Sequence, residues 1–168
     1  FSTYDLPVSI IRPFNTYGPR QSMRAIIPTI ITQALKNKKY IKLGSLYPTR
    51  DFCYVDDTVS GFISISESKK SIGEVINIGS GYEISIKEVT NIIMDLTNTR
   101  SKIISEEKRV RPKKGEVDRL RANINKAKKL IDWEPKFKGK HGLRAGLVKT
   151  IKWFNHNLEN YKTDIYNT

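Results

Sequence analysis

The 168-residue sequence has little cysteine, little acidic charge and no long apolar run. Its single cysteine, Cys53, excludes an internal disulfide and is typical of proteins of a reducing compartment. No stretch approaches the ~20 consecutive apolar residues that a membrane-spanning helix requires, and no charged-then-apolar leader opens the sequence. His141 and His156 stand apart from any cluster with ligand spacing, so we expect no metal site. We therefore expect a cytoplasmic protein without membrane contact.

Positive charge is abundant and unevenly distributed. The formal net charge is +13, and residues 100–152 alone hold 18 Lys/Arg against 6 Asp/Glu. Such a segment suits nucleic acid, an anionic membrane, a phosphorylated small molecule or simply solvated helix faces. Because it lacks interleaved exposed aromatic residues for base stacking, we do not expect nucleic acid as the partner.

Strand and helix patterns alternate along the chain, which indicates an α/β fold. Val8–Ile11 is a short apolar run, typical of a strand buried on both faces of a parallel sheet, and Val75–Ile78 is a second short β-branched strand. Tyr40–Leu43 and Asp51–Val55 predict two further short strands. Since two central strands do not form a stable doubly wound sheet, we expect further sequence to complete the fold.

Apolar periodicity predicts five helices, over about 26–35, 57–68, 86–96, 127–131 and 142–158. Asp56 or Asp57 is expected to cap the second helix. We expect the buried face of that helix to carry Val59, Phe62 and Ile63.

Other local patterns predict structure rather than chemistry. Ser85 and Glu88 form a capping box at the start of the third helix. Residues 100–120 read as basic and irregular. Trp133 and Trp153 are expected in the core, and Cys53 is expected to be buried and inert.

Three segments place an arginine at a strand end or turn. They read RPFNTYGPR at 12–20, GSLYPTRDFCYVDD at 44–57 and RPKKGEVDRLRANINKAKKLIDWEP at 111–135. Arginine binds phosphate through paired, fixed N–H donors, and Asn15 can donate an amide N–H without adding charge. Each arginine alone is more often structural, but arginines that converge from such distant segments would neutralise a diphosphate.

In order and spacing these segments resemble the C-terminal portion of the extended short-chain dehydrogenase/reductase family, the NAD-dependent nucleotide-sugar epimerases and dehydratases. The family pattern Arg-Pro-x-Asn-x-Tyr-Gly-Pro matches residues 12–19, Arg-Asp-Phe-x-Tyr-Val-x-Asp matches 50–57, and Asn-Ile-Gly matches 77–79. An Arg-Pro segment and a Leu-x-x-Trp-x-Pro close follow, so the resemblance covers residues 1–159. The sequence is most similar to UDP-N-acetylglucosamine 4,6-dehydratases of the legionaminic-acid type, although residues 116–118 also resemble GDP-mannose 4,6-dehydratases.

The resemblance implies which residues bind the diphosphate of the substrate. Asn15 matches a residue that bonds the diphosphate, and Arg50 and Arg111 match the two arginines that clamp it. Arg20 and Arg24 lie near the implied substrate path and are weaker candidates.

Further roles are implied for the nucleobase and for NAD. Ile41 and Leu43 fall where the backbone of a short strand pairs with the base of a UDP-sugar. Pro13 and Phe14 match the loop that lies against the nicotinamide carboxamide of NAD.

The implied reaction begins with oxidation of the sugar at C4 by hydride transfer to NAD⁺. A 4,6-dehydratase then eliminates water across C5–C6 and returns the hydride to C6, whereas a 4-epimerase returns it to the other face of C4. The family's catalytic Tyr-x-x-x-Lys pair and its glycine-rich turn after the first strand are both absent from the 168 residues. We therefore assign no catalytic residue, and we expect the chain to be inactive without an N-terminal NAD-binding half.

The same resemblance implies the organisation of the chain. Residues 1–15 and 75–97 would belong to a Rossmann-like sheet, 16–74 and 98–160 to the sugar-nucleotide-binding domain, and 161–168 to a frayed tail. The parent would be a homodimer that pairs through helices outside this sequence and acts in cell-surface polysaccharide biosynthesis. A non-catalytic nucleotide-sugar or RNA-binding module is the alternative from another class.

Overall fold

The computed structural model describes residues 3–110, 112 and 115–161. The strands are β1 (Ile10–Pro13), β2 (Thr16–Tyr17), β3 (Tyr40–Leu43), β4 (Thr49–Asp51), β5 (Cys53–Tyr54), β6 (Val75–Ile78), β7 (Glu83–Ser85), β8 (Lys102–Ser105) and β9 (Arg119–Leu120). The α-helices are α1 (Ile26–Leu35), α2 (Val55–Glu67), α3 (Ile86–Thr97), α4 (Asn125–Ile131) and α5 (Gly139–His156). Strands and helices alternate, so the predicted α/β class is confirmed.

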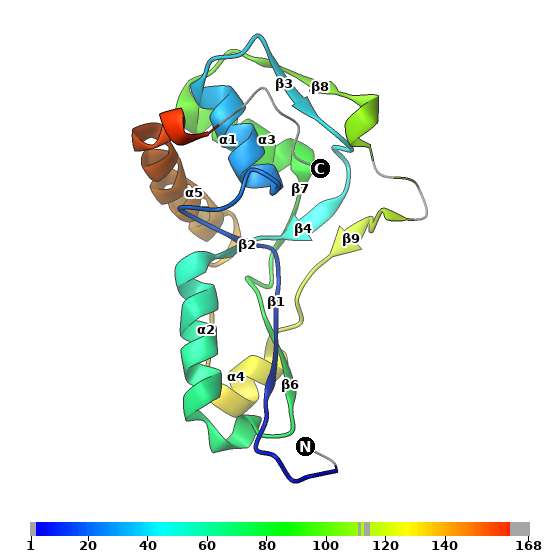
Figure 1. Ribbon diagram of the computed structural model, residues 1–168, viewed down its shortest axis with the longest axis vertical. Coiled ribbons are helices and arrows are strands. Elements are labelled where there is room, and N and C mark those ends of the chain that lie inside the picture. The colour runs from blue at the N-terminus through cyan, green and yellow to red at the C-terminus, as the bar shows by residue number, and fades with distance from the viewer. Residues whose placement is uncertain (1–2, 111, 113–114, 162–168) are drawn as a thin grey trace.

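Parallel pairing joins strands that are far apart in the sequence. β1 pairs with β6, β2 with β5, β3 with β8, and β4 with β9. β4 also pairs antiparallel with β7, so β4 is the central strand of a three-stranded sheet. Figure 1 shows this sheet between a lower group of β1, β6, α2 and α4 and an upper group of α1, α3, α5, β3 and β8.

The upper group encloses the larger apolar core. Helix α1 contacts α3 and α5, and all three turn isoleucine, leucine or phenylalanine side chains inward. Ile30, Ile93 and Phe154 are completely buried there. The predicted capping box starts α3, with the Glu88 backbone N–H donating to Ser85 Oγ.

The lower group has a smaller core between α2, α4 and the β1–β6 pair. Trp133 is buried in it, as predicted, and its indole N–H donates to Ser60 Oγ at 2.8 Å. Gly61 allows α2 to approach β6, because an added Cβ would lie 2.8 Å from Ile78. Trp153 is only partly buried, against the upper core.

The predicted orientation of α2 was wrong. Val59, Phe62 and Ile63 are each about half exposed, because the helix packs through Thr58, Gly61 and Ile65 instead. The cap prediction was also wrong, since the helix begins at Val55 and the N-cap residue is Tyr54.

Asp57, one of the predicted cap residues, has another structural role. It is buried and accepts the backbone N–H groups of Lys136 and Phe137, at 2.8 and 2.9 Å. Asp57 therefore ties α2 to the segment that leads into α5.

Three further predictions about strands need correction. The first strand is not buried on both faces: Val8 and Ile10 are exposed, and pairing begins only at Ile10. The segment 100–120 is not irregular throughout, because it contributes β8 and β9 to two parallel pairs. The single predicted strand over 51–55 is divided into β4 and β5, and α2 begins at Val55.

Candidate functional site

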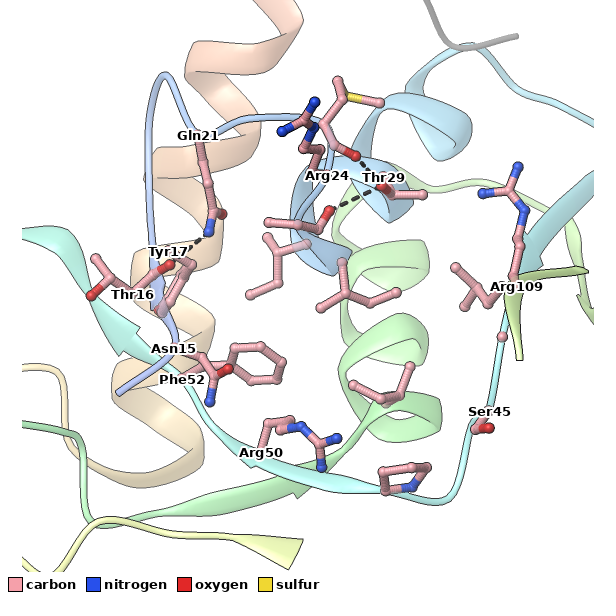
Figure 2. A pocket seen from close by; sticks show the side chains of 18 of the residues that line it. Asn15, Thr16, Tyr17, Gln21, Arg24, Thr29, Ser45, Arg50, Phe52 and Arg109 are labelled. Atoms are coloured by element: carbon pink, nitrogen blue, oxygen red, sulfur yellow. Dashed lines mark hydrogen bonds between the residues drawn. The ribbon is translucent and has the colours of Figure 1, made fainter. Parts of the chain in front are cut away.

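A cavity of about 360 Å³, called the main cavity below, lies where β2, β3 and β4 end near α1 (Figure 2). Its lining includes four cationic side chains, those of Arg24, Lys42, Arg50 and Arg109, and one acidic side chain, that of Glu116. Polar and aromatic lining residues include Asn15, Gln21, Thr29, Ser45 and Phe52. Its volume lies within the range typical of small-molecule sites.

Arg50 extends from β4 into this cavity (Figure 2). Its Nη1 donates to the backbone oxygens of Thr49 at 2.8 Å and Val117 at 2.6 Å. Its Nη2 donates to Glu116 Oε1 at 2.7 Å. The side chains of Arg50 and Glu116 are only 13% and 9% exposed, so both charges are largely removed from water.

Asn15 lies at the same end of the cavity as Arg50 in Figure 2. Its Nδ2 donates to the backbone oxygen of Asp51 at 3.1 Å, which holds the loop after β1 against β4. The backbone N–H of Cys53 donates to Asn15 O at 3.1 Å. These two contacts fix the position of the Asn15 amide relative to the strand that carries Arg50.

Asp51 holds β4 in place from the opposite side. Its buried carboxylate accepts four hydrogen bonds, from Ser80 N and Oγ, Gly81 N and Ala122 N, at 2.6 to 3.1 Å. Four donors satisfy the carboxylate without a neighbouring cation. Asp51 therefore positions Arg50 and Asn15 without lining the cavity itself.

Glu83 of β7 and Arg119 of β9 form an ion pair that links the two strands on either side of β4. The Glu83 carboxylate accepts from Thr49 Oγ1 and from Arg119 Nε, each at 2.8 Å. The hydrogen bond from Arg119, followed by that from Thr49, lowers the pKa of Glu83 to about 2. The strand that carries Arg50 is thus held on both edges.

Two further cations of the main cavity share one carboxylate. Arg109 Nε donates to Glu106 Oε2 at 2.6 Å, and Lys42 Nζ lies 3.4 Å from Glu106 Oε1. The hydrogen bond from Arg109 is the main reason why the pKa of Glu106 lies below its usual value. Glu106 does not line the cavity, whereas both cations do.

The structure brings together part of the predicted substrate site. Asn15, Arg24, Leu43 and Arg50 all line the main cavity. Arg111, the other predicted diphosphate ligand, lies outside the described residues.

The structure places the other predicted residues away from the main cavity. Arg20 is exposed with a φ of 64° and does not line the cavity, and the Ile41 side chain is completely buried in the core. Pro13 and Phe14 line a separate, shallower hollow together with Asn15.

The cavity also contains residues that sequence reasoning missed. Arg109 and Glu116 flank the Arg-Pro motif, but their charges gave no indication of which residues they contact. Gln21 Nε2 donates to Thr16 O at 2.6 Å, whereas Gln21 Oε1 is buried without a hydrogen-bond partner among the described residues. A ligand or water that donates an N–H or O–H would satisfy that oxygen.

Three other predictions concern features outside the cavity. Cys53 is completely buried, as predicted, and burial raises the pKa of its thiol to about 12, so the reactive thiolate does not form near neutral pH. Among the described residues, no helix combines the length and hydropathy needed to cross a bilayer. Within the same residues no group of three or more His, Cys, Asp or Glu has metal-binding geometry.

Parallel strands joined through helices define an α/β protein, and its candidate site is a cavity lined by cationic side chains at the strand ends. Residues 1–145 match the family described as GDP-mannose 4,6 dehydratase, and the chain belongs to this family. Its relatives are nucleotide-sugar dehydratases, epimerases and decarboxylases.

Individual relatives agree with this assignment. The chain is 35% identical over 165 residues to a UDP-N-acetyl-alpha-D-glucosaminuronate decarboxylase of Bacillus cytotoxicus, covering 95% of this chain and 50% of the relative. It is 32% identical over 162 residues to the human dTDP-D-glucose 4,6-dehydratase, covering 95% of this chain and 45% of the relative. The chain therefore spans about half the length of the curated relatives it matches.

Solved structures show the same fold. A UDP-glucuronic acid 4-epimerase from Bacillus cereus, in complex with UDP-glucuronic acid and NAD, matches with a TM-score of 0.82 and 30% identity. That match covers 93% of this chain and 48% of the epimerase. A dTDP-glucose 4,6-dehydratase from Bacillus anthracis, in complex with NAD, matches with a TM-score of 0.82 and 33% identity over 94% of this chain and 48% of the other.

Proposed function

We propose that the main cavity binds the nucleoside diphosphate of a nucleotide sugar. The chain is then the sugar-nucleotide-binding portion of an NAD-dependent 4,6-dehydratase that acts on a substrate like UDP-N-acetylglucosamine. The observation that carries the proposal is the convergence of Arg50 and Asn15, from separate strand ends, on one cavity. A guanidinium and an amide donor suit a diphosphate, because burying phosphate charge without compensating donors is costly.

The remaining lining residues support a ligand longer than a phosphate. In Figure 2, Arg109 and Ser45 lie across the cavity from Asn15 and Arg50. Leu43 and Gly44 also line the cavity, and the Leu43 side chain itself is buried in the core. The backbone N–H and C=O of Lys42 are both bonded to the Gln33 side chain, so Lys42 does not offer its backbone to a base. We place the base against Leu43 and Gly44 instead of Ile41.

NAD would meet only the edge of this chain. Pro13 and Phe14 line an open hollow next to Asn15, and we propose that one end of the dinucleotide contacts it. When bound, NAD supplies the hydride acceptor for oxidation of the sugar. Because the sequence has neither a Tyr-x-x-x-Lys pair nor the glycine-rich turn that follows the first strand of the family fold, we propose that the isolated chain binds substrate without turning it over.

Two groups of exposed apolar side chains support the proposal of an additional half. Val59, Phe62 and Ile63 on α2 are each about half exposed, and so are Ile10 on β1 and Val75 on β6, which pair in register. Exposed apolar groups of this kind are typical of interfaces. We propose that the NAD-binding half covers them and adds strands beside β1.

The distribution of basic residues does not favour the RNA-binding alternative. Many cations of the 100–152 segment face carboxylates: Lys126 pairs with Glu74, Arg144 with Asp95, and Lys128 with Glu134. Pairing of this kind disperses positive potential instead of concentrating it in one stripe. A 4-epimerase remains the second candidate, because the B. cereus structural relative is an epimerase.

Calorimetric titration of UDP into the 168-residue chain tests the proposed function. We expect UDP to bind, and Arg50→Ala to weaken binding by roughly tenfold or more, because a charge-assisted hydrogen bond contributes about 1.5–3 kcal/mol. Arg144→Ala is the matched control, since this arginine pairs with Asp95 and does not line the cavity. Equal UDP affinity in Arg50→Ala and the unmodified chain would contradict the proposal.

A further inference from the structure

Glu116 is the one acidic side chain among the described residues that line the main cavity. Its Oε1 accepts from Arg50 Nη2 at 2.7 Å, and the next residue, Val117, accepts from Nη1 of the same guanidinium at 2.6 Å. The segment around Glu116 therefore holds the Arg50 donors that face it. Both side chains are nearly buried, so water screens their attraction weakly.

The other cations of the cavity are arranged differently. Lys42 and Arg109 pair with Glu106. Because Glu106 does not line the cavity, a ligand in the cavity can approach these two cations without contacting its carboxylate. At Arg50, by contrast, the paired carboxylate is itself part of the cavity wall. A phosphate oxygen bound to the same Nη2 would lie close to Glu116 Oε1, and like charges at such a distance repel strongly in a partly buried site.

We propose that Glu116 is an internal competitor for the phosphate-binding side of Arg50. In the ligand-free chain its carboxylate occupies one of the Nη2 donors of Arg50, and it must move away before an anion can bind that same donor. Free phosphate or pyrophosphate gains too little from Arg50 alone to displace it effectively. A nucleoside diphosphate also contacts the remainder of the cavity and overcomes this opposition. The last of these steps rests on the proposed function, whereas the competition itself does not.

The test compares Glu116→Gln with the unmodified chain in titrations of magnesium-free pyrophosphate and of UDP at constant ionic strength. Gln keeps the size of the side chain but removes its charge. We expect the variant to bind pyrophosphate about tenfold more tightly, which corresponds to a change of about 1.4 kcal/mol. Glu107→Gln is the matched control, because Glu107 is exposed and outside the cavity lining, and it should change affinity by less than about twofold.

Unchanged, weaker or undetectable pyrophosphate binding by Glu116→Gln contradicts the proposed competition, whether or not the UDP affinity changes. If the unmodified chain fails to bind UDP while Glu116→Gln gains pyrophosphate affinity, the proposed function fails and the competition stands. Glu116→Ala, which also removes the charge, provides the same comparison if the Gln variant does not fold. Circular dichroism of each variant establishes which of them is folded.

Discussion

The carboxylate of Asp51 accepts a hydrogen bond from the backbone N–H of Ala122, at 3.1 Å across 71 residues of sequence. The same carboxylate holds the backbone N–H groups of Ser80 and Gly81 in the turn after β6. Asp51 follows Arg50 directly, so one buried side chain joins three distant segments at the base of the candidate site. The position of the Arg50 guanidinium depends on this junction.

Replacing Asp51 should therefore destabilise the fold. Asp51→Ala leaves several buried donors without an acceptor, and we expect a loss of roughly 3 kcal/mol or more in the free energy of unfolding. Asp51→Asn should also destabilise, because an amide N–H cannot accept from the donors that surround it. Urea unfolding measures both. Asp95→Ala, whose side chain is 64% exposed, should cost less than about 1 kcal/mol, and equal losses at both positions would refute this account.

Gly146 permits α5 to pack against the buried tyrosines of β2 and β5. A Cβ at this position would lie 2.2 Å from Tyr17 Oη and 2.9 Å from Tyr54 Cδ2. Although alanine favours a helix by about 1 kcal/mol over glycine, we expect Gly146→Ala to lower the unfolding free energy by about 1–3 kcal/mol through overpacking. Thermal unfolding checks this. Gly115→Ala, with no atom within 4 Å of the added carbon, should have little effect.

The ion pair between Glu83 and Arg119 predicts a specific acid sensitivity. The hydrogen bonds from Arg119 and Thr49 lower the pKa of Glu83 from 4.5 to about 2 in the folded chain. Because the folded pKa lies below the ordinary one, the stabilisation is complete above about pH 4.5 and is lost as the pH falls toward 2. The unfolding free energy of Glu83→Gln should thus depend less on pH across this window. Parallel pH profiles for the two proteins would argue against the assignment.

The outer face of α2 should control self-association of the chain. Phe62 is 48% exposed and lies beside Val59 and Ile63 on the same helix. Phe62→Lys should reduce concentration-dependent association in sedimentation velocity without loss of stability, because an interface face is disrupted by a charge. Tyr47→Lys is the control, since Tyr47 is an exposed aromatic residue outside α2. An equal effect of both variants would show that the α2 face has no special role.

The sequence predicted local structure more successfully than it predicted which face of a helix is buried. The capping box of Ser85 and Glu88 involves residues three apart, so it could be identified directly. The α2 stripe was assigned to the core because periodicity identifies an apolar stripe but not the surface that covers it. β8 escaped detection because its partner, β3, lies some sixty residues earlier and the segment is rich in charge.

The same distinction applies to the site. The family resemblance implied that Arg50 and Asn15 bind substrate, and both line the main cavity. The partnership of Arg50 with Glu116 could not be predicted, because it depends on how the segment after the Arg-Pro motif folds back onto β4. Arg20 and Arg24 lie in one loop, yet only Arg24 lines the cavity. Their positions in the sequence do not indicate which of the two arginines lines the cavity.

A crystal structure of the 168-residue chain with UDP tests the central claim most directly. We predict that the pyrophosphate lies in the main cavity within hydrogen-bond distance of the Arg50 guanidinium and the Asn15 amide, with the base toward Leu43. A nucleotide bound instead to the basic surfaces of α4 and α5, with the main cavity empty, would contradict the account.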